Sequence, residues 1–253
     1  MAVATDVGTG RYVYALISVA AAQPQYDSIG IDGAAVYSIA VGQVAAVVSD
    51  VANRTIRPER RHLAAHQQVL RRLFEQTTPL PATFGTIADG CEGIHTILSR
   101  NQATFLRQLQ RLADTVEMGL KVLWDVPNIF AYFVNTDTEL KALRDRFFHG
   151  GRDPSVEEKL ELGRVFERLL RERRALHTEE VVQVLRTRCL EIKENDPRTE
   201  REVMDLACLV ERRAQRTFEE GVFEAAKSFD SSYAFDFSGP WPPHSFTELD
   251  LET

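Results

Sequence analysis

Three prolines surround a tryptophan in the segment Gly239-Pro-Trp-Pro-Pro-His-Ser-Phe246. Each proline fixes its own φ near about −65° and lacks a backbone N–H, and the residue before each proline is held in an extended conformation. The segment is therefore predicted to be stiff and extended, and it excludes a helix or a central strand. We expect Trp241 to be mostly buried against the C-terminal domain as a packing anchor. The alternative is that Trp241 belongs to a docking surface for a partner.

Composition narrows the class of protein. The chain has 253 residues, of which 44% are hydrophobic and 26% charged, as in an ordinary soluble globular protein of one or two domains. The net charge of −7 argues against a general nucleic-acid binder, since there is no excess of positive charge to neutralise phosphates. The three cysteines are far apart, and no apolar run approaches the roughly 20 residues of a membrane span. We therefore expect a cytoplasmic protein that contacts neither nucleic acid nor membrane.

The first half of the chain alternates strand and helix patterns. Leu80–Ile87 predicts a strand whose start lacks a ladder donor at Pro81 and which has a bulge or a close backbone approach at Gly85. The other elements come from β-branched runs and from apolar stripes at helical spacing. They are strands at 11–19, 36–41 and 44–49, a helix that opens at Pro58 and a helix over 91–114.

The second half has a different order of elements. Val116–Trp124 alternates apolar and polar residues and predicts a strand, and Val203–Val210 predicts a central one. A capping box at Thr136 predicts one helix start, and Asp153-Pro154-Ser155 with Glu158 predicts another through a cap, a proline in the first turn and an acid close behind. A further start is possible near His177. With a possible strand near 189–193, a helix over 211–227 and a strand at 233–237, the order resembles ferredoxin-like βαββαβ with an enlarged helical first crossover. We predict an α+β chain of two domains, an N-terminal α+β domain over 1–115 and a ferredoxin-like domain over 116–253 that ends in the Pro/Trp tail.

A search for catalytic groups finds no constellation. Neither GxGxxG after a strand nor GxxxxGK[ST] is present. His62 and His66 are four residues apart and could hold a metal on one helix face, but we favour structural roles, with one exposed and one partly buried imidazole. Arginine-rich stretches at 57–72, 164–174 and 198–216 are interleaved with Glu, which favours solvated helix faces over an anion or RNA surface. We predict no enzyme, no cofactor and no metal.

Four groups of residues together resemble one family, the gas vesicle protein F/L family. The match runs in order from position 12 to 246, and the proline–tryptophan ending is its most specific part. One departure is His244, where Tyr is common in the family. The groups are Tyr12–Leu16 with Ala45–Ser49, His66 with the run Pro79–Thr86, Glu117–Val122, and Gly239–Phe246. The motif positions expected to be structural or partner-binding are Pro81, Phe84, Gly85, Thr86, Glu117, Lys121, Gly239, Pro240, Trp241, Pro242, Pro243 and Phe246.

The resemblance implies a function without catalysis. A protein of this family would be a cytoplasmic accessory or minor structural protein of gas vesicle assembly, associated with the vesicle. It would bind the hydrophobic shell subunit and other accessory gas vesicle proteins, and we expect the shell contact on the β surface of the N-terminal domain or in the groove near the tail. The alternative is an RNA- or small-ligand-binding ferredoxin-like module, which predicts two or three aromatic side chains exposed on one sheet face.

Overall fold

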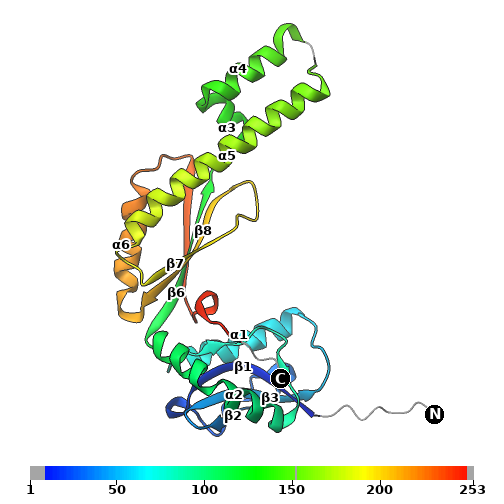
Figure 1. The fold of residues 1–253 in the computed structure, drawn as a ribbon, viewed down its shortest axis with the longest axis vertical. Helices are drawn as coiled ribbons and strands as arrows, with labels where there is room; N and C mark the ends of the chain where they lie inside the picture. Colours follow the sequence, from blue (N-terminus) through cyan, green and yellow to red (C-terminus); the bar gives the residue numbers. More distant parts are fainter. Residues whose placement is uncertain (1–8, 152, 250–253) are drawn as a thin grey trace, which may run out of the picture. The chain divides into compact units, whose positions relative to one another are not determined.

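The computed structural model describes residues 9–151 and 153–249, and these residues form an α+β protein with two sheets (Figure 1). By their contacts the residues group into two units. The first takes the chain up to Glu117 together with the part from Pro240 onward, and the second is Met118–Gly239. The break near 117 lies close to the boundary expected at 115. The Pro/Trp ending, however, groups with the first unit, whereas the sequence placed it in the C-terminal domain.

The sheet of the first unit is antiparallel, in the order β2-β3-β1-β4, and β5 also pairs with β1. The predicted strand over 80–87 is only partly formed, because residues 82–86 leave the ladder between β4 and β5. Pro81 has no N–H to continue the ladder, and Gly85 has a φ of +88°, which suits glycine. The strands are β1 (Thr9–Ser18), β2 (Val36–Val41), β3 (Val44–Ala52), β4 (Leu80–Pro81) and β5 (Ile87–Ala88).

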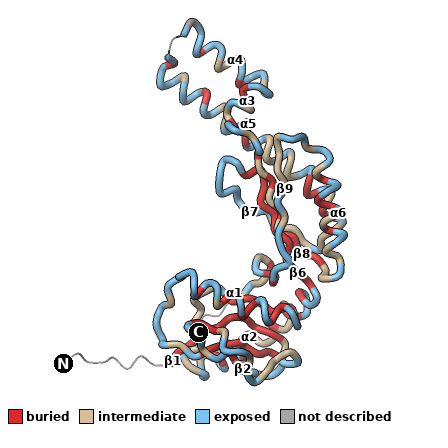
Figure 2. Tube along the Cα trace, turned by 180° about the vertical axis from the view of Figure 1, so that it is seen from behind, coloured by how far each residue is buried: buried red, intermediate tan, exposed pale blue. Residues whose placement is uncertain are grey.

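Helices α1 (Arg60–Phe74) and α2 (Gly90–Arg111) cover the two faces of this sheet (Figure 1). Val69, Leu70 and Leu73 of α1 share a core cluster with Tyr12 and Tyr14 of β1. The apolar side chains of α2 meet the opposite face, where Val13, Leu16, Ala46, Ile94, Ile97 and Leu98 line one small cavity. The strands are therefore among the most buried parts of the unit (Figure 2). Burial on both sides explains why β1 is a continuous apolar run and not an alternating one.

The second unit is built on a sheet in the order β7-β8-β6-β9, so β8 is internal as predicted. The elements follow the expected order of strand, helices, strand, strand, helix, strand. Helices α5 and α6 contact β8 and each other, and they cover one face of the sheet (Figure 1). The elements are β6 (Thr115–Trp124), α5 (Val156–Leu185), β7 (Glu191–Asn195), β8 (Glu202–Glu211), α6 (Gln215–Ala226) and β9 (Tyr233–Trp241).

The first crossover of this unit holds three helices, α3 (Ile129–Thr136), α4 (Thr138–Phe147) and α5. The helix start expected at Asp153-Pro154-Ser155 is present, but Pro154 lies before the cap and not in the first turn: Ser155 is the N-cap, and Ser155 and Glu158 bond each other's backbone N–H. The capping box predicted at Thr136 is wrong, because Thr136 ends α3 and Asp137 caps α4 instead. No new helix starts near His177, and α5 runs unbroken for 30 residues.

Short 3-10 segments complete the fold, and among the described helices none is long and apolar enough to cross a membrane. The 3-10 segments are η1 (Val19–Ala21), η2 (Ile31–Gly33), η3 (His149–Gly151), η4 (Arg212–Ala214) and η5 (His244–Phe246).

Candidate functional site

The Pro/Trp ending continues β9 as far as Trp241 and then turns. Gly239 has a φ of +123°, and Pro242 and Pro243 are buried. His244–Phe246 then closes a 3-10 turn, η5. The prediction of an extended segment holds as far as Pro243. It fails for η5, since the residues after the last proline have their N–H groups and can form a turn.

The anchor of this segment is Phe246, not Trp241. The Phe246 side chain is fully buried, with 0% of the residue exposed, whereas Trp241 is 43% exposed. The expectation of a mostly buried Trp241 packed on the second unit is therefore wrong. Trp241 ends an edge strand, where a side chain has neighbouring strands on one side only.

Three side chains of the first unit hold the residues that follow, and we call Gln108, Arg111 and Glu117 the tail-docking site. Both carboxylate oxygens of Glu117 accept from Ser245: Oε2 from the backbone N–H at 2.7 Å and Oε1 from the hydroxyl at 2.8 Å. The Nη2 of Arg111 donates to the Phe246 carbonyl at 2.6 Å. These bonds to charged groups are of the stronger kind, and they fix the position of the chain beside Phe246.

Gln108 completes the tail-docking site one turn away on α2. Its Oε1 accepts from the backbone N–H of Glu248 at 2.8 Å, and its Nε2 donates to the Glu248 carbonyl. The amide thus satisfies both backbone groups of one residue, as a neighbouring strand would do in a sheet.

The motif residues Phe84 and Gly85 lie against a buried polar cluster. The Gly85 N–H donates to the Tyr12 hydroxyl at 3.1 Å, and this hydroxyl lies 2.9 Å from Nδ1 of His66. The Phe84 ring meets the Tyr12 and His66 rings edge-on, with centroids 6.1 and 5.7 Å away. This part of the family motif therefore packs the loop between β4 and β5 onto β1.

Pro81 and Thr86 mark the two ends of that loop. Pro81 is buried and pairs with Ala15 of β1. The Thr86 carbonyl accepts from the N–H of Val13 at 2.9 Å, and its hydroxyl donates to the Thr83 carbonyl at 2.7 Å. Both motif residues thus have structural roles at the edge of β1.

His62 and His66 are both buried, so the expectation of one exposed and one partly buried imidazole is wrong. Burial and the nearby charge of His244 lower the pKa of His66 to about 4, against a hydrogen bond with the Ala82 carbonyl. The carbonyl of Arg57 and the carboxylate of Asp32 raise the pKa of His62. Each ring therefore has its own partners, and within the described residues no group of three or more His, Cys, Asp or Glu side chains could hold a metal.

Lys121 of the motif acts in the second unit. Its Nζ lies 2.8 Å from Oδ2 of Asp205 and 3.7 Å from Oε1 of Glu202, two buried carboxylates of β8. The hydrogen bond with Asp205 raises the pKa of Lys121. Glu117 and Lys121 lie on the same face of β6. Glu117 binds the tail, whereas Lys121 pairs with the two carboxylates of β8.

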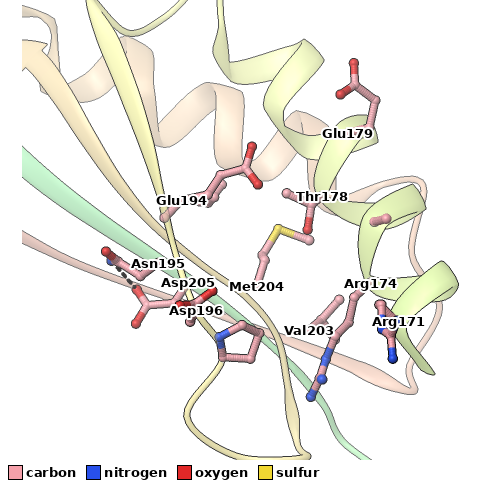
Figure 3. A pocket seen from close by; sticks show the side chains of 13 residues that line it. Arg171, Arg174, Thr178, Glu179, Glu194, Asn195, Asp196, Val203, Met204 and Asp205 are labelled. Carbon is pink, nitrogen blue, oxygen red and sulfur yellow. Dashed lines mark hydrogen bonds between the residues drawn. The ribbon is translucent and has the colours of Figure 1, made fainter. Parts of the chain in front are cut away.

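A cavity of about 490 Å³ lies between α5 and the β7–β8 pair (Figure 3). Its lining carries both signs of charge, with Arg171 and Arg174 from α5 and Asp196 and Asp205 from the β7–β8 side. The guanidinium of Arg174 already has partners, because it donates to the carbonyls of residues 199, 200 and 202 at 2.9 to 3.1 Å. We interpret Arg174 as a residue that holds the β7–β8 connection in place.

The aromatic side chains of β9 lie on the helix-covered face of the second sheet. Tyr233 meets His177 of α5, and Phe237 meets Phe223 of α6. The opposite face carries Lys121 with Asp205. This arrangement does not favour the alternative of an RNA-binding sheet, which requires exposed aromatics for base stacking.

Comparison with known proteins identifies the family. The family model described as gas vesicle synthesis protein GvpL/GvpF matches residues 10–248. The chain belongs to this family.

Gas vesicle protein F of Nostoc sp. (strain PCC 7120) is 26% identical over 227 residues, covering 87% of this chain and 91% of the relative. Gas vesicle protein F of Streptomyces sp. (strain CB03234) is 28% identical over 209 residues, covering 82% and 85%. The crystal structure of GvpF from Anabaena sp. PCC7120 superposes with a TM-score of 0.81 at 23% identity, covering 96% of this chain and 100% of that one.

For this GvpL/GvpF family member, the structure brings only some motif residues together. Glu117 meets the segment that contains Phe246, and Phe84 and Gly85 lie together on Tyr12. Sequence reasoning missed Gln108 and Arg111. Their positions on the polar side of α2 carry no signal of the tail that they bind.

The pKa of His66 predicts a pH dependence of stability. Because the folded pKa of about 4 lies below the ordinary value of 6.5, the unfolded chain takes up the proton first as the pH falls. The contribution of neutral His66 to the free energy of unfolding is fully present above about pH 6.5. It is lost as the pH falls toward 4, by up to about 3 kcal/mol. We expect urea unfolding of the wild type to show this loss between pH 7 and 5, and of His66→Gln to lack it. Equal slopes for the two proteins would contradict the prediction, and the contribution of His62 cancels in the difference.

The burial of Phe246 predicts which tail residue matters for stability. Phe246→Ala should cost about 3–5 kcal/mol of the free energy of unfolding, because it empties a filled site. Trp241→Ala should cost much less, since that side chain is well exposed. Urea unfolding followed by circular dichroism compares the two variants. The assignment of Phe246 as anchor is wrong if Trp241→Ala is the more damaging change.

Proposed function

We propose that this GvpL/GvpF family member is a non-enzymatic assembly factor that binds the hydrophobic shell subunit of the gas vesicle. It would act in the cytoplasm, together with other accessory gas vesicle proteins. Family membership over residues 10–248 supports a role in gas vesicle synthesis. An exposed apolar stripe on α5 supports the contact with the shell subunit.

The α5 stripe consists of Val156, Leu160 and Gly163. These residues follow a spacing of four and three, so they lie on one face of the helix. Val156 is 70% exposed and Leu160 is 55% exposed, although both are large apolar side chains. Exposed apolar side chains that gather on one helix face are typical of an interaction surface.

Gly163 adds an independent argument. A glycine inside a helix destabilises it by about 0.5–1 kcal/mol relative to alanine. A Cβ built on Gly163 would meet no atom within 4 Å, so nothing in the fold requires the glycine. Its position beside Val156 and Leu160 suits the close approach of a partner backbone.

Charged residues border the α5 stripe. Arg146 of α4 pairs with Glu161 at 3.4 Å, and Lys159 pairs with Asp153 at 3.1 Å. An apolar centre with a polar rim is the usual anatomy of a protein interface. Phe148, at the C-terminal end of α4, is also 45% exposed and adds apolar area to the same helical crossover.

The two surfaces expected from the sequence are less suitable. Both faces of the first sheet are covered by α1 and α2, so its β surface is not available. A cavity of about 380 Å³ lies beside the tail, but its lining of Asn101, Thr104, Phe105, Gln108, Glu248 and Leu249 includes no exposed large apolar side chain. The α5 stripe is therefore the surface we assign to the shell subunit.

A pull-down with purified shell subunit tests the proposal. We expect Val156→Ser/Leu160→Ser to weaken binding roughly tenfold or more, since each lost apolar contact is worth about 1–2 kcal/mol. The matched control is Leu176→Ser/Leu190→Ser, which changes two leucines of similar exposure outside the stripe. Loss of binding in both variants, or in neither, would count against the stripe. No binding by the wild type would remove shell binding altogether.

Gly163→Ala distinguishes the effect of this glycine on stability from its effect on binding the shell subunit. The variant should be about 0.5–1 kcal/mol more stable, because alanine favours the helix and the added methyl meets open space. If a partner backbone approaches Gly163, the same variant should bind the shell subunit more weakly. Thermal unfolding and the pull-down measure the two effects. A more stable variant with unchanged binding would show that the partner does not reach Gly163.

A further inference from the structure

The tail-docking site holds its segment as a binding site holds a peptide. Four main-chain groups of the tail are satisfied there: the N–H of Ser245, the carbonyl of Phe246, and both groups of Glu248. All four bonds come from side chains of α2 and β6, and none requires that the tail belong to the same chain. Main-chain bonds of this kind give affinity in peptide-recognition sites.

Two features add specificity. The fully buried Phe246 side chain is an aromatic anchor, the kind of residue that carries most of the energy of an interface. The Ser245 hydroxyl uses the second oxygen of Glu117, so the carboxylate recognises both the backbone and the side chain. The buried pair Pro242-Pro243 stiffens the segment before it binds, which reduces the entropy lost on docking.

The connection to the docked segment is exposed. Ser238, Gly239, Pro240 and Trp241 all lie on the surface, although they belong to or end β9. The φ of +123° at Gly239 is a value that other residues rarely adopt. Glycine tolerates a wider range of dihedral angles than other residues, so Gly239 at the end of β9 is the position where the chain can redirect the segment beyond it.

We propose that the tail-docking site is a peptide-recognition site for residues 242–248 of a second copy of this chain. Two copies that exchange these segments form again every hydrogen bond that the tail makes within one copy, so the exchange costs mainly the entropy of association. The segment of this same chain is the occupant that the structure supports, because it already fits the site. Within one chain the attached tail competes with the tail of a second copy, at a local concentration on the order of millimolar. Exchange is therefore favoured where the copies themselves are crowded to a comparable concentration. This inference goes beyond the proposed function and does not depend on shell binding.

A complementation experiment with full-length chains tests the exchange. One copy carries Arg111→Ala and Glu117→Ala, which leave its tail intact but damage its site. The other carries Ser245→Ala and Phe246→Ala, which leave its site intact but damage its tail. We expect a one-to-one complex when the two are mixed, by size-exclusion chromatography with light scattering, and monomers when each is alone. A mixture that remains two monomers would overturn the proposal.

A labelled peptide of residues 240–249 provides a second measurement on the same proteins. We expect it to bind the tail-damaged chain roughly tenfold or more tightly than the wild type, whose own tail competes. A peptide with alanine in place of Phe246 should bind neither. Binding that ignores this change would overturn the proposal, as would capture of another gas vesicle protein at the site in preference to a second copy. If circular dichroism shows that the doubly changed chain is unfolded, Ser245→Ala alone takes its place.

Discussion

Two tyrosine hydroxyls buried in the first sheet require hydrogen-bond partners, and several surrounding segments are positioned to supply them. Tyr12 and Tyr14 are fully buried on β1, and a buried hydroxyl without a partner costs several kcal/mol on apolar reference scales, about 1–3 in proteins. The Tyr14 hydroxyl accepts from the N–H of Ile31 at 2.8 Å and lies 2.8 Å from Oγ of Ser49. The Tyr12 hydroxyl accepts from Gly85 and bonds His66. The connection after β1, the strand β3, the helix α1 and the loop before β5 are thus all tied to these two groups.

The same network explains the chemistry of His66. Its Nδ1 lies beside a hydroxyl that already accepts from Gly85, so the hydroxyl proton is free to go to the imidazole. This assignment fits a neutral ring, and the low pKa of His66 follows from its burial, which disfavours the charged imidazolium. The loop that carries the family motif thus packs against an imidazole that is neutral at about pH 7.

Local signals in the sequence predicted the elements well where a few neighbouring residues decide the outcome. The helix start near Ser155 and the internal position of β8 are of this kind. Interactions between distant residues could not be predicted. Arg111 binds a carbonyl 135 residues later in the chain, and nothing on the polar side of α2 announces that partner. The prolines around Trp241 favour it as the anchor, but this residue ends an edge strand and is exposed, and Phe246 is the buried residue instead.

The unbroken helix α5 has a mechanical consequence. Its C-terminal half is fixed in the core of the second unit by Val181, Val182 and Leu185, whereas Phe166 in its N-terminal half packs on α3. At about 1.5 Å per residue, its 30 residues span roughly 45 Å without a joint. A force on Val156 would therefore be transmitted to the sheet through the continuous backbone hydrogen bonds of the helix. Because α5 is a rigid connection, the sheet and not a flexible linker would set the orientation of a partner bound near Val156.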